Sequence, residues 1–199
     1  MKNKKSKAGI RKEEILNAAL KCFNKKGYYK TAVEDIAKKI GITKAAIYYY
    51  FNTKKELFIK LFHFKVYNYF NEVSKNIHYT SNDPIGYYNK RIQTSDEIFK
   101  KNIDVFKFCL EFITVSAREP DIKKEVTRFY EHRIAEFSTT MERGIQDGKF
   151  CPCDTESIAV IFYFLSMGFF LTYFSVNKNI HYEKHFNMFF NMLYKEIIK

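Results

Sequence analysis

Apolar residues recur along most of the chain at steps of three or four, the spacing of one helix face. Ile15, Ala19 and Phe23 lie on one such stripe and predict a first helix over residues 10–26, with Gly27 as its stop. The period-two alternation of a half-buried strand is missing, and only 3 Pro and 7 Gly interrupt the chain. The pattern therefore predicts an all-α fold.

Residues 31–57 predict two short helices joined by a tight turn. Thr31 and Glu34 have the spacing of a capping box, so we expect a helix to begin there. Gly41 can take the positive φ that ends this helix, and Thr43 can cap a second one. Such a pair forms a helix-turn-helix, whose second helix enters the DNA major groove, although the same shape also occurs as a purely structural corner.

The second short helix is predicted to be amphipathic. Its expected inward positions are Ala46, Ile47, Tyr50 and Phe51, and its outward positions are Lys44, Ala45, Tyr48 and Tyr49. Thr53 and Glu56 then form another capping box, which opens a long helix over residues 54–75. Its expected buried positions include Leu57, Leu61, Phe64 (or Phe62) and Phe70.

A polar loop at residues 76–82 separates this helix from the next, for which Asp83 and Pro84 supply an N-cap and a first-turn proline. Further helices are expected over residues 84–101, 103–117 and 121–147. A final helix carries a stripe that needs a partner, formed by Tyr182, Phe186, Phe189, Leu193 and Ile197.

Residues 158–176 contain no charged side chain, and their length meets the usual threshold for a membrane span. A helix that is apolar all round can instead be sandwiched between its own domain and a partner subunit. Because the stretch contains Ser, Thr and Tyr residues and its flanks show no strong positive bias, we prefer a buried dimer helix.

Charge divides the chain unevenly. Residues 1–60 contain 16 Lys and Arg against 5 Asp and Glu, whereas residues 61–199 contain 18 against 17. Nearly all of the net charge of +12 therefore lies in the first third, which favours a polyanionic partner. The Lys-rich residues 1–9 are expected to form a tail that either reaches DNA or only aids solubility.

A resemblance to a known family rests on six residues: Gly41, Thr43, Tyr48, Phe51, Lys54 and Leu57. Their order and spacing resemble the DNA-binding domain of the TetR family of one-component transcriptional regulators, closely over about residues 15–61 and loosely beyond. The resemblance implies an N-terminal three-helix helix-turn-helix domain over residues 1–53. It also implies a larger helical ligand-binding and dimerisation domain over residues 54–199, with about nine helices.

Eight residues of the helix-turn-helix region are predicted to contact DNA. Thr31 and Lys54, at helix N-termini, are expected to bind phosphates. Tyr48 and Tyr49 are expected to add phosphate contacts through their hydroxyls, with core packing as the alternative. The start of the recognition helix should meet base edges through Thr43, Lys44, Ala45 and Ala46, since Lys can donate to guanine and Ala methyls can pack on thymine.

The C-terminal part contains the candidates for an effector and for dimerisation. The resemblance implies a pocket for a small, largely apolar molecule, for which we select Phe106, Cys109, Phe112, Tyr130, Phe137 and Tyr163. Aromatic residues at helical spacing are, however, more often plain core. The resemblance also implies a four-helix dimer interface from the last two helices, with Phe162, Phe169, Tyr173, Phe186, Phe189 and Leu193. Arg118, Arg128 and Arg133 could meet an anion, but surface pairing with Glu131 or Glu136 is the favoured interpretation.

Other chemistry is poorly supported. The four Cys fit no disulfide framework and the N-terminus lacks an apolar signal region, so we expect a reducing cytoplasm. A zinc or thiol-sensing role would have to come from Cys151, Cys153, His181 and His185, but the two Cys are closer than usual zinc ligands. We therefore predict no metal and no cofactor. Motifs of nucleophile elbows, P-loops, dinucleotide sites and metalloproteases are missing, so we predict that the protein is not an enzyme.

The sequence thus predicts a cytoplasmic, homodimeric, ligand-responsive repressor that binds double-stranded DNA at a pseudo-palindromic operator. Its effector is an unidentified small molecule, and no membrane contact is expected. The alternative is an effector-free architectural or protein-partner-controlled DNA-binding protein. A third interpretation, a membrane-anchored protein, would use residues 158–176.

Overall fold

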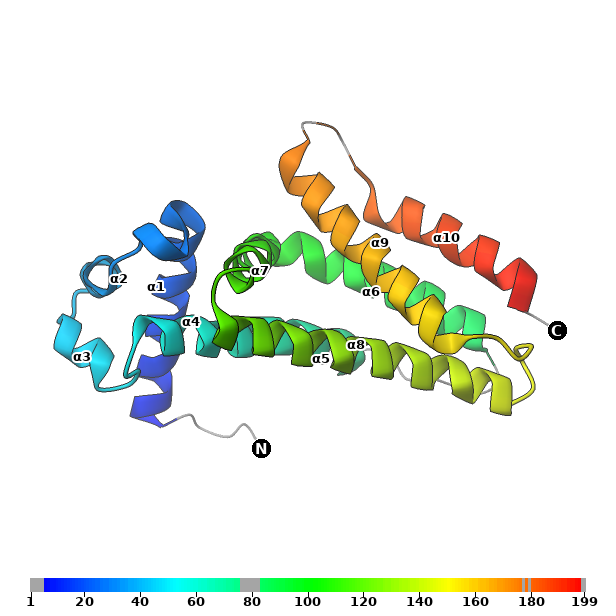
Figure 1. Cartoon of the computed structure of the whole chain (residues 1–199), viewed down its shortest axis with the longest axis horizontal. Coiled ribbons are helices and arrows are strands. Elements are labelled where there is room, and N and C mark those ends of the chain that lie inside the picture. Colours follow the sequence, from blue (N-terminus) through cyan, green and yellow to red (C-terminus); the bar gives the residue numbers. More distant parts are fainter. Residues whose placement is uncertain (1–5, 76–82, 177, 179, 198–199) are drawn as a thin grey trace. The chain divides into compact units, whose positions relative to one another are not determined.

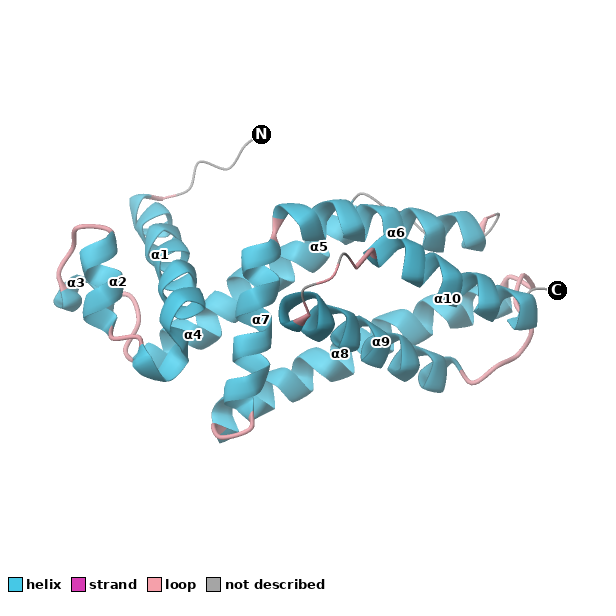
Figure 2. Cartoon of the chain, turned by 90° about the horizontal axis from the view of Figure 1, so that it is seen from above, coloured by secondary structure: helices cyan, strands magenta, loops and turns pink. Residues whose placement is uncertain are grey.

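The computed structural model describes residues 6–75, 83–176, 178 and 180–197, which fold into helices joined by short loops (Figures 1 and 2). No strand occurs among these residues, which confirms the all-α prediction. The expected loop at 76–82 and the first five residues of the basic tail lie outside the described residues.

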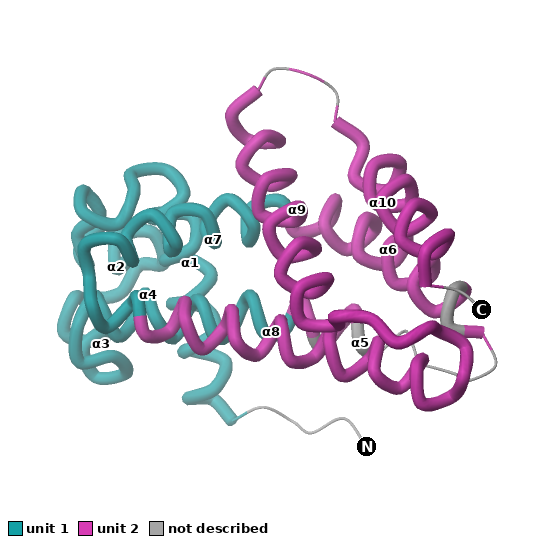
Figure 3. The backbone as a smooth tube through the Cα atoms, turned by 45° about the vertical axis from the view of Figure 1, so that its right-hand side comes forward, with its two compact units in different colours: residues 1–68, 103–123 teal, residues 69–102, 124–199 magenta. Residues whose placement is uncertain are grey.

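The chain divides into two compact units (Figure 3). Unit 1 consists of residues 1–68 and 103–123, and unit 2 of residues 69–102 and 124–199. Residues 54–68 and 103–123 therefore belong to the same compact unit as the helix-turn-helix, whereas the sequence suggested a domain boundary after residue 53. As a functional division, that boundary stays a prediction.

Unit 1 is built around the first helix, α1 (Lys7–Lys30), which Ser6 caps. Gly27 interrupts α1 as predicted, with φ of 74°, although a helical turn continues to Lys30. The other elements of this unit are α2 (Val33–Lys39), α3 (Lys44–Tyr48), α4 (Lys54–Phe62), the π-helical segment η1 (His63–Tyr67), α7 (Ile103–Ser116) and the first turn of α8 (Pro120–Gln146).

The core of unit 1 is aromatic. Phe58 on α4 lies at its centre, with ring centroids 4.8 Å from Phe23, 5.0 Å from Phe108 and 5.0 Å from Phe112. All four side chains are almost fully buried, so α1, α4 and α7 share one core. Burial of this much aromatic surface stabilises the base on which the helix-turn-helix is mounted.

The predicted 54–75 helix is not α-helical throughout. Leu57 and Leu61 are buried as expected, but the π segment η1 follows α4 and shifts the phase of the buried face. From η1 onward the buried positions are Val66, Tyr69 and Val73. Of the expected Phe64 or Phe62, Phe62 is buried and Phe64 is half-buried, and the expected Phe70 is also only half-buried. A uniform period of 3.6 residues therefore selects the wrong aromatic residues beyond Phe62.

Unit 2 contains α5 (Asn68–Lys75, from Tyr69), α6 (Pro84–Lys101), the rest of α8, α9 (Thr155–Ser175) and α10 (Tyr182–Ile197). As predicted, Asp83 caps α6, accepting from the Gly86 amide at 2.8 Å, and Gly148, with φ of 70°, follows α8. The stripe predicted on α10 is partly wrong. Its buried side chains are Tyr182, Phe186, Phe190, Tyr194 and Ile197, whereas Phe189 and Leu193 are only half-buried.

Helix α9 coincides with the uncharged stretch of the sequence. An 18-residue window within it has mean hydropathy 1.8, so it is long and apolar enough to cross a membrane by length and composition alone. Only Ala159, Phe169 and Phe170 are buried in the single chain. Ile161, Phe164 and Leu171 are exposed and most of the other apolar side chains are half-buried, so part of the apolar surface of α9 is uncovered in the single chain.

Candidate nucleic-acid interface

The helix-turn-helix consists of α2, a short turn and α3. Gly41 takes φ of 67° in the turn, a region that side chains disfavour, and the Ile42 amide donates to the Ala37 carbonyl at 3.1 Å. Thr43 then caps α3, because its hydroxyl accepts from the Ala46 amide at 3.1 Å. These are the turn and the cap expected from the sequence.

Helix α3 has one anchored face and one open face. Ile47 and Phe51 are buried, and Ala46 and Tyr50 are half-buried. On the other side Tyr49 exposes 82% of its surface and Tyr48 exposes 38%. Thr43, Lys44 and Ala45 are exposed as well, so Ala46 is the one predicted contact around α3 that is not exposed.

An ion pair restrains the main candidate for base recognition. Lys44 Nζ lies 2.5 Å from Glu34 Oε1 and 5.7 Å from the centroid of the Tyr48 ring. The side-chain bond to Lys44 lowers the pKa of Glu34 and raises that of Lys44. Because both side chains are 49% exposed, the pair contributes little stability, and DNA can displace it. Sequence reasoning assigned Glu34 to a capping box and therefore missed this role.

The predicted roles of Thr31 are wrong. Its side chain is 1% exposed, and its hydroxyl points inward, 2.7 Å from the Gly27 carbonyl and 3.3 Å from the Cys22 carbonyl. Ala32 occupies the N-cap position of α2, and its amide donates to Asp35 Oδ2 at 3.0 Å. Thr31 thus closes the end of α1 and offers no hydroxyl to a phosphate.

Lys54 also differs from its predicted role. Its ammonium donates to the carbonyls of Tyr28 at 2.9 Å and Thr31 at 3.1 Å, and it lies 4.5 Å from the Tyr28 ring centroid. Burial lowers the pKa of Lys54. The cation therefore satisfies carbonyls at the end of α1 and joins that end to α4, instead of projecting as a phosphate ligand.

Helix α7 is attached to the same end of α1. Glu111 Oε1 accepts from the Tyr28 amide at 2.6 Å, and Asn24 Nδ2 donates to the Asp104 carbonyl at 2.8 Å. On α4, Lys55 pairs with Glu119 at 3.1 Å and Asp121 at 3.0 Å, which lie around the start of α8. Residues distant in sequence thus fix the base of the helix-turn-helix.

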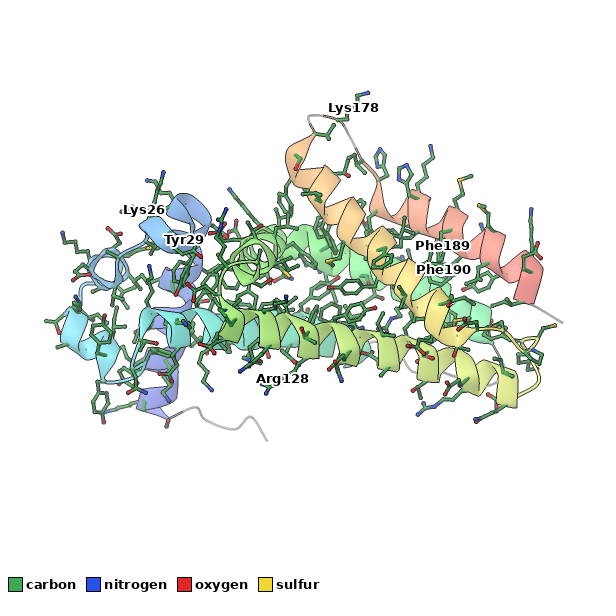
Figure 4. The ribbon with its side chains drawn as sticks, viewed as in Figure 1. Lys26, Tyr29, Arg128, Lys178, Phe189 and Phe190 are labelled. Carbon is green, nitrogen blue, oxygen red and sulfur yellow. The ribbon has the colours of Figure 1, made fainter. Side chains whose placement is uncertain are left out.

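Two further side chains lie on the exposed surface of unit 1. Tyr29 is 52% exposed although its neighbour Tyr28 is buried, and Lys26 pairs with Asp35 at 2.7 Å (Figure 4). Tyr29 was not among the predicted contacts, and no sequence signal separates it from Tyr28. The difference arises because Gly27 interrupts the helix just before them.

The six predicted effector residues fall into two sets. Phe106, Cys109 and Phe112 are buried on α7 in unit 1, where Phe112 stacks on Phe62 with centroids 4.0 Å apart. Tyr130, Phe137 and Tyr163 belong to unit 2, where the first and last form an edge-to-face pair at 5.0 Å. The α7 set is core, whereas in unit 2 Phe137 is buried and Tyr130 and Tyr163 are half-buried. The role of all six in effector binding stays a prediction.

A separate polar groove of about 500 Å³ lies between α6 and α10. Its lining contains none of the predicted effector residues and consists of Gly86, Asn89, Lys90, Gln93, Glu183, Asn187 and Asn191.

The residues predicted for the dimer interface are distributed between the inside and the edge of unit 2. Phe169 and Phe186 are buried within the chain, at 8% and 0% exposure, so they cannot present an outward contact surface in this form. Phe162, Tyr173, Phe189 and Leu193 are half-buried. The open apolar positions on α9 and α10 are instead Ile161, Phe164, Leu171, Met188 and Met192.

The cysteine and histidine candidates do not assemble into a metal site. Among the described residues, no group of three His, Cys, Asp or Glu is placed to hold a metal ion. Cys151 and Cys153 are free, half-buried thiols, and His181 and His185 are exposed.

Comparison with known proteins agrees with this geometry. Residues 15–61 match the family described as "Bacterial regulatory proteins, tetR family". The biofilm operon icaADBC HTH-type negative transcriptional regulator IcaR of Staphylococcus epidermidis is 27% identical over 169 residues, which span 82% of this chain and 85% of that protein. These relatives are transcriptional regulators and not enzymes.

Two solved structures share the fold over nearly the whole chain. A protein described as a transcriptional regulator from Saccharomonospora viridis, in complex with choline, has a TM-score of 0.80 at 19% identity, covering 96% of this chain and 98% of its own. SmeT in complex with triclosan has a TM-score of 0.81 at 16% identity, with coverage of 96% and 92%. At these identities the likeness is one of fold alone.

Proposed function

Because the chain belongs to the TetR family of bacterial regulatory proteins, we propose that it is a homodimeric repressor whose two α3 helices bind the halves of a pseudo-palindromic operator. The observation that carries this proposal is the form of α3. Thr43 caps the helix and Ile47 anchors it, while Lys44 and Tyr49 stand open to a duplex. The positive charge of the first 60 residues also favours binding of DNA by this part of the chain.

Dimerisation is supported by the uncovered surface of α9 and α10. Ile161, Phe164 and Leu171 follow helical spacing along one side of α9, and Met188 and Met192 do so on α10. Exposed apolar surface on two neighbouring helices matches the isologous contact of a two-fold dimer. These five positions replace Phe169 and Phe186 in the interface that the sequence suggested.

Control by a small molecule is the second half of the proposal. One structural relative holds choline and another holds triclosan, so the shared fold accommodates organic ligands of different charge. Unit 2 of this chain is rich in aromatic contacts, which suits a largely apolar effector. Such a ligand can release DNA only if it prefers the state that does not bind DNA. We place the protein in the cytoplasm, where its operator lies.

Selection of bound sequences from random duplexes tests the DNA-binding part. We expect a sequence with two-fold symmetry, bound by two copies of the chain, and we expect Lys44→Ala to relax preference at particular base pairs in each half. Sequences without symmetry, or retention of a single copy per duplex, would contradict the proposal. Screening organic molecules for release of this duplex then separates a ligand-responsive repressor from an effector-free DNA-binding protein.

A further inference from the structure

A half-buried ionic cluster in unit 2 joins α6 and α8. Arg91 Nη2 on α6 lies 3.0 Å from Glu136 Oε1, and Arg133 Nη1 donates to Glu136 Oε2 one turn earlier on α8. The side chains of Arg91, Arg133 and Glu136 expose only 17%, 13% and 29% of their surface. The sequence favoured a surface pair of Arg133 with Glu131 or Glu136; the pair with Glu136 is confirmed, but both side chains are less exposed than a surface pair would be.

The charges of this cluster do not balance. Two guanidinium groups, which stay protonated in proteins, share one carboxylate. Among the described residues, Glu136 is the only acid paired with either of them. Arg91 also donates to the Tyr87 hydroxyl at 3.0 Å, but most of the guanidinium N–H groups bond to no described residue. Both side chains are partly exposed, and none of their nitrogens is fully buried without a hydrogen-bond partner, so water reaches the free donors. A further carboxylate would replace that water and balance the second guanidinium charge.

The surroundings of the cluster are aromatic. Arg133 Cζ lies 4.0 Å from the centroid of the Phe70 ring on α5, and Phe70 lies 5.5 Å from Phe129. Tyr69, next to Phe70, is buried, and its hydroxyl donates to the Ser95 carbonyl at 3.3 Å. Burial raises the pKa of Tyr69 and lowers that of Arg133, as expected in a poorly hydrated place.

We propose that Arg91 and Arg133 bind the carboxylate of a small organic acid with an apolar body. A guanidinium group offers paired donors that match the two oxygens of a carboxylate, and the aromatic rings suit the rest of such a molecule. The excess of one positive charge fits a monocarboxylate better than a phosphate dianion. The inference rests on the proposed function, since it names the chemical class of the effector.

Binding of simple probes to the full-length protein tests the inference without DNA. We expect octanoate or 2-naphthoate to bind at least tenfold more tightly than octanamide or octyl phosphate in titration calorimetry. Equal binding of octanoate and octanamide, a preference for the phosphate, or no binding of either acid at 5 mM would overturn it.

Three variants separate recognition from a merely structural role. Arg133→Met leaves a balanced Arg91–Glu136 pair, so it should weaken acid binding at least tenfold without lowering the melting temperature. Glu136→Gln leaves two unpaired guanidinium groups and should tighten acid binding. Arg128→Met, on the same helix, removes a 68% exposed side chain (Figure 4) and should change neither property. A lower melting temperature of Arg133→Met together with unchanged acid binding would assign the cluster to structure alone.

Release of operator DNA distinguishes this inference from the function on which it rests. If acids bind through Arg133 but leave the DNA complex intact, the acid-binding site is supported and the proposal of a ligand-released repressor is contradicted. If octanamide releases DNA as well as octanoate does, the proposal of a ligand-responsive repressor is supported and the acid-binding site is contradicted.

Discussion

At the scale of single residues, the end of α1 shows how a cation can serve structure inside a DNA-binding unit. The last carbonyls of a helix have no partners within it. Lys54 donates to three carbonyls in this region and lies over the Tyr28 ring. The Thr31 hydroxyl lies against the carbonyls of Gly27 and Cys22. The positive charge therefore acts at the negative end of the α1 dipole.

Replacing this cation should affect folding first. We expect Lys54→Met to lower the free energy of unfolding by about 1–3 kcal/mol, because charge-assisted hydrogen bonds are lost and carbonyls are left unsatisfied. DNA affinity should fall for all sequences alike, with the salt dependence unchanged. Denaturant unfolding and fluorescence anisotropy at several salt concentrations measure both effects, with Lys60→Met on the exposed side of α4 as the control. A salt slope reduced by about one with full stability would restore Lys54 as a phosphate ligand.

Replacing Lys44, in contrast to Lys54, should affect base recognition and leave folding stability nearly unchanged. Removing its ammonium in Lys44→Ala should reduce discrimination against particular wrong base pairs by roughly 1–3 kcal/mol, while folding stability stays nearly constant because the side chain is exposed. Glu34→Gln, which frees Lys44 and removes a negative charge beside DNA, should tighten binding to all duplexes. Competition assays with single-base operator variants measure both. Uniform weakening by Lys44→Ala across all sequences would refute its role in base recognition.

At the scale of helices, α9 carries an exposed apolar surface formed by Ile161, Phe164 and Leu171. Burying a Glu at a contact of the proposed dimer should be unfavourable by about 3 kcal/mol or more, so Leu171→Glu should weaken this dimerisation roughly 100-fold. Thr172→Glu, exposed one position further along the helix, is the matched control. Sedimentation over a range of concentrations distinguishes the two. An unchanged dimer, or a wild-type chain that needs detergent to stay in solution, would contradict the assignment of this surface.

The contact between α6 and α8 should respond to acid. Burial alone would raise the pKa of Glu136, but Arg133 and Arg91 outweigh it and hold the pKa below the ordinary value of 4.5. The charged form therefore stabilises the fold above that value, and this stability is lost as the pH falls below 4.5 towards the folded-state pKa. Urea unfolding between pH 3 and 7 should show a steeper loss below 4.5 for the wild type than for Glu136→Gln. Parallel curves would exclude a contribution from this carboxylate.

Helix positions were predictable because apolar spacing and caps are local signals. Asp83 and Pro84, for example, predicted the start of α6 correctly. Thr31 and Lys54 were misassigned because a polar group near a helix end has several possible partners, and tertiary packing selects one. On α9 every face is apolar, so spacing could not tell the covered Phe169 from the open Leu171. The phase shift at η1 likewise has no signature in the pattern.

At the scale of the whole molecule, the uneven charge should dominate the energetics of DNA binding. A dimer that neutralises about 6–10 phosphates should lose roughly 10³–10⁵ in affinity between 50 and 200 mM salt. Anisotropy titrations with the selected operator measure this slope. A nearly flat dependence would mean that the basic first third does not face the DNA backbone.

The bond between Glu111 and the Tyr28 amide limits how far this regulator can be treated as modular. Phe58 is covered partly by Phe108 and Phe112, which follow it by some fifty residues. A fragment that ends at residue 68 lacks Phe108, Phe112 and Glu111. It would expose the Phe58 ring to water and leave the Tyr28 amide without its carboxylate acceptor. Transplanting the DNA-reading head into another regulator would therefore require two separate pieces of the gene, encoding residues 1–68 and 103–123.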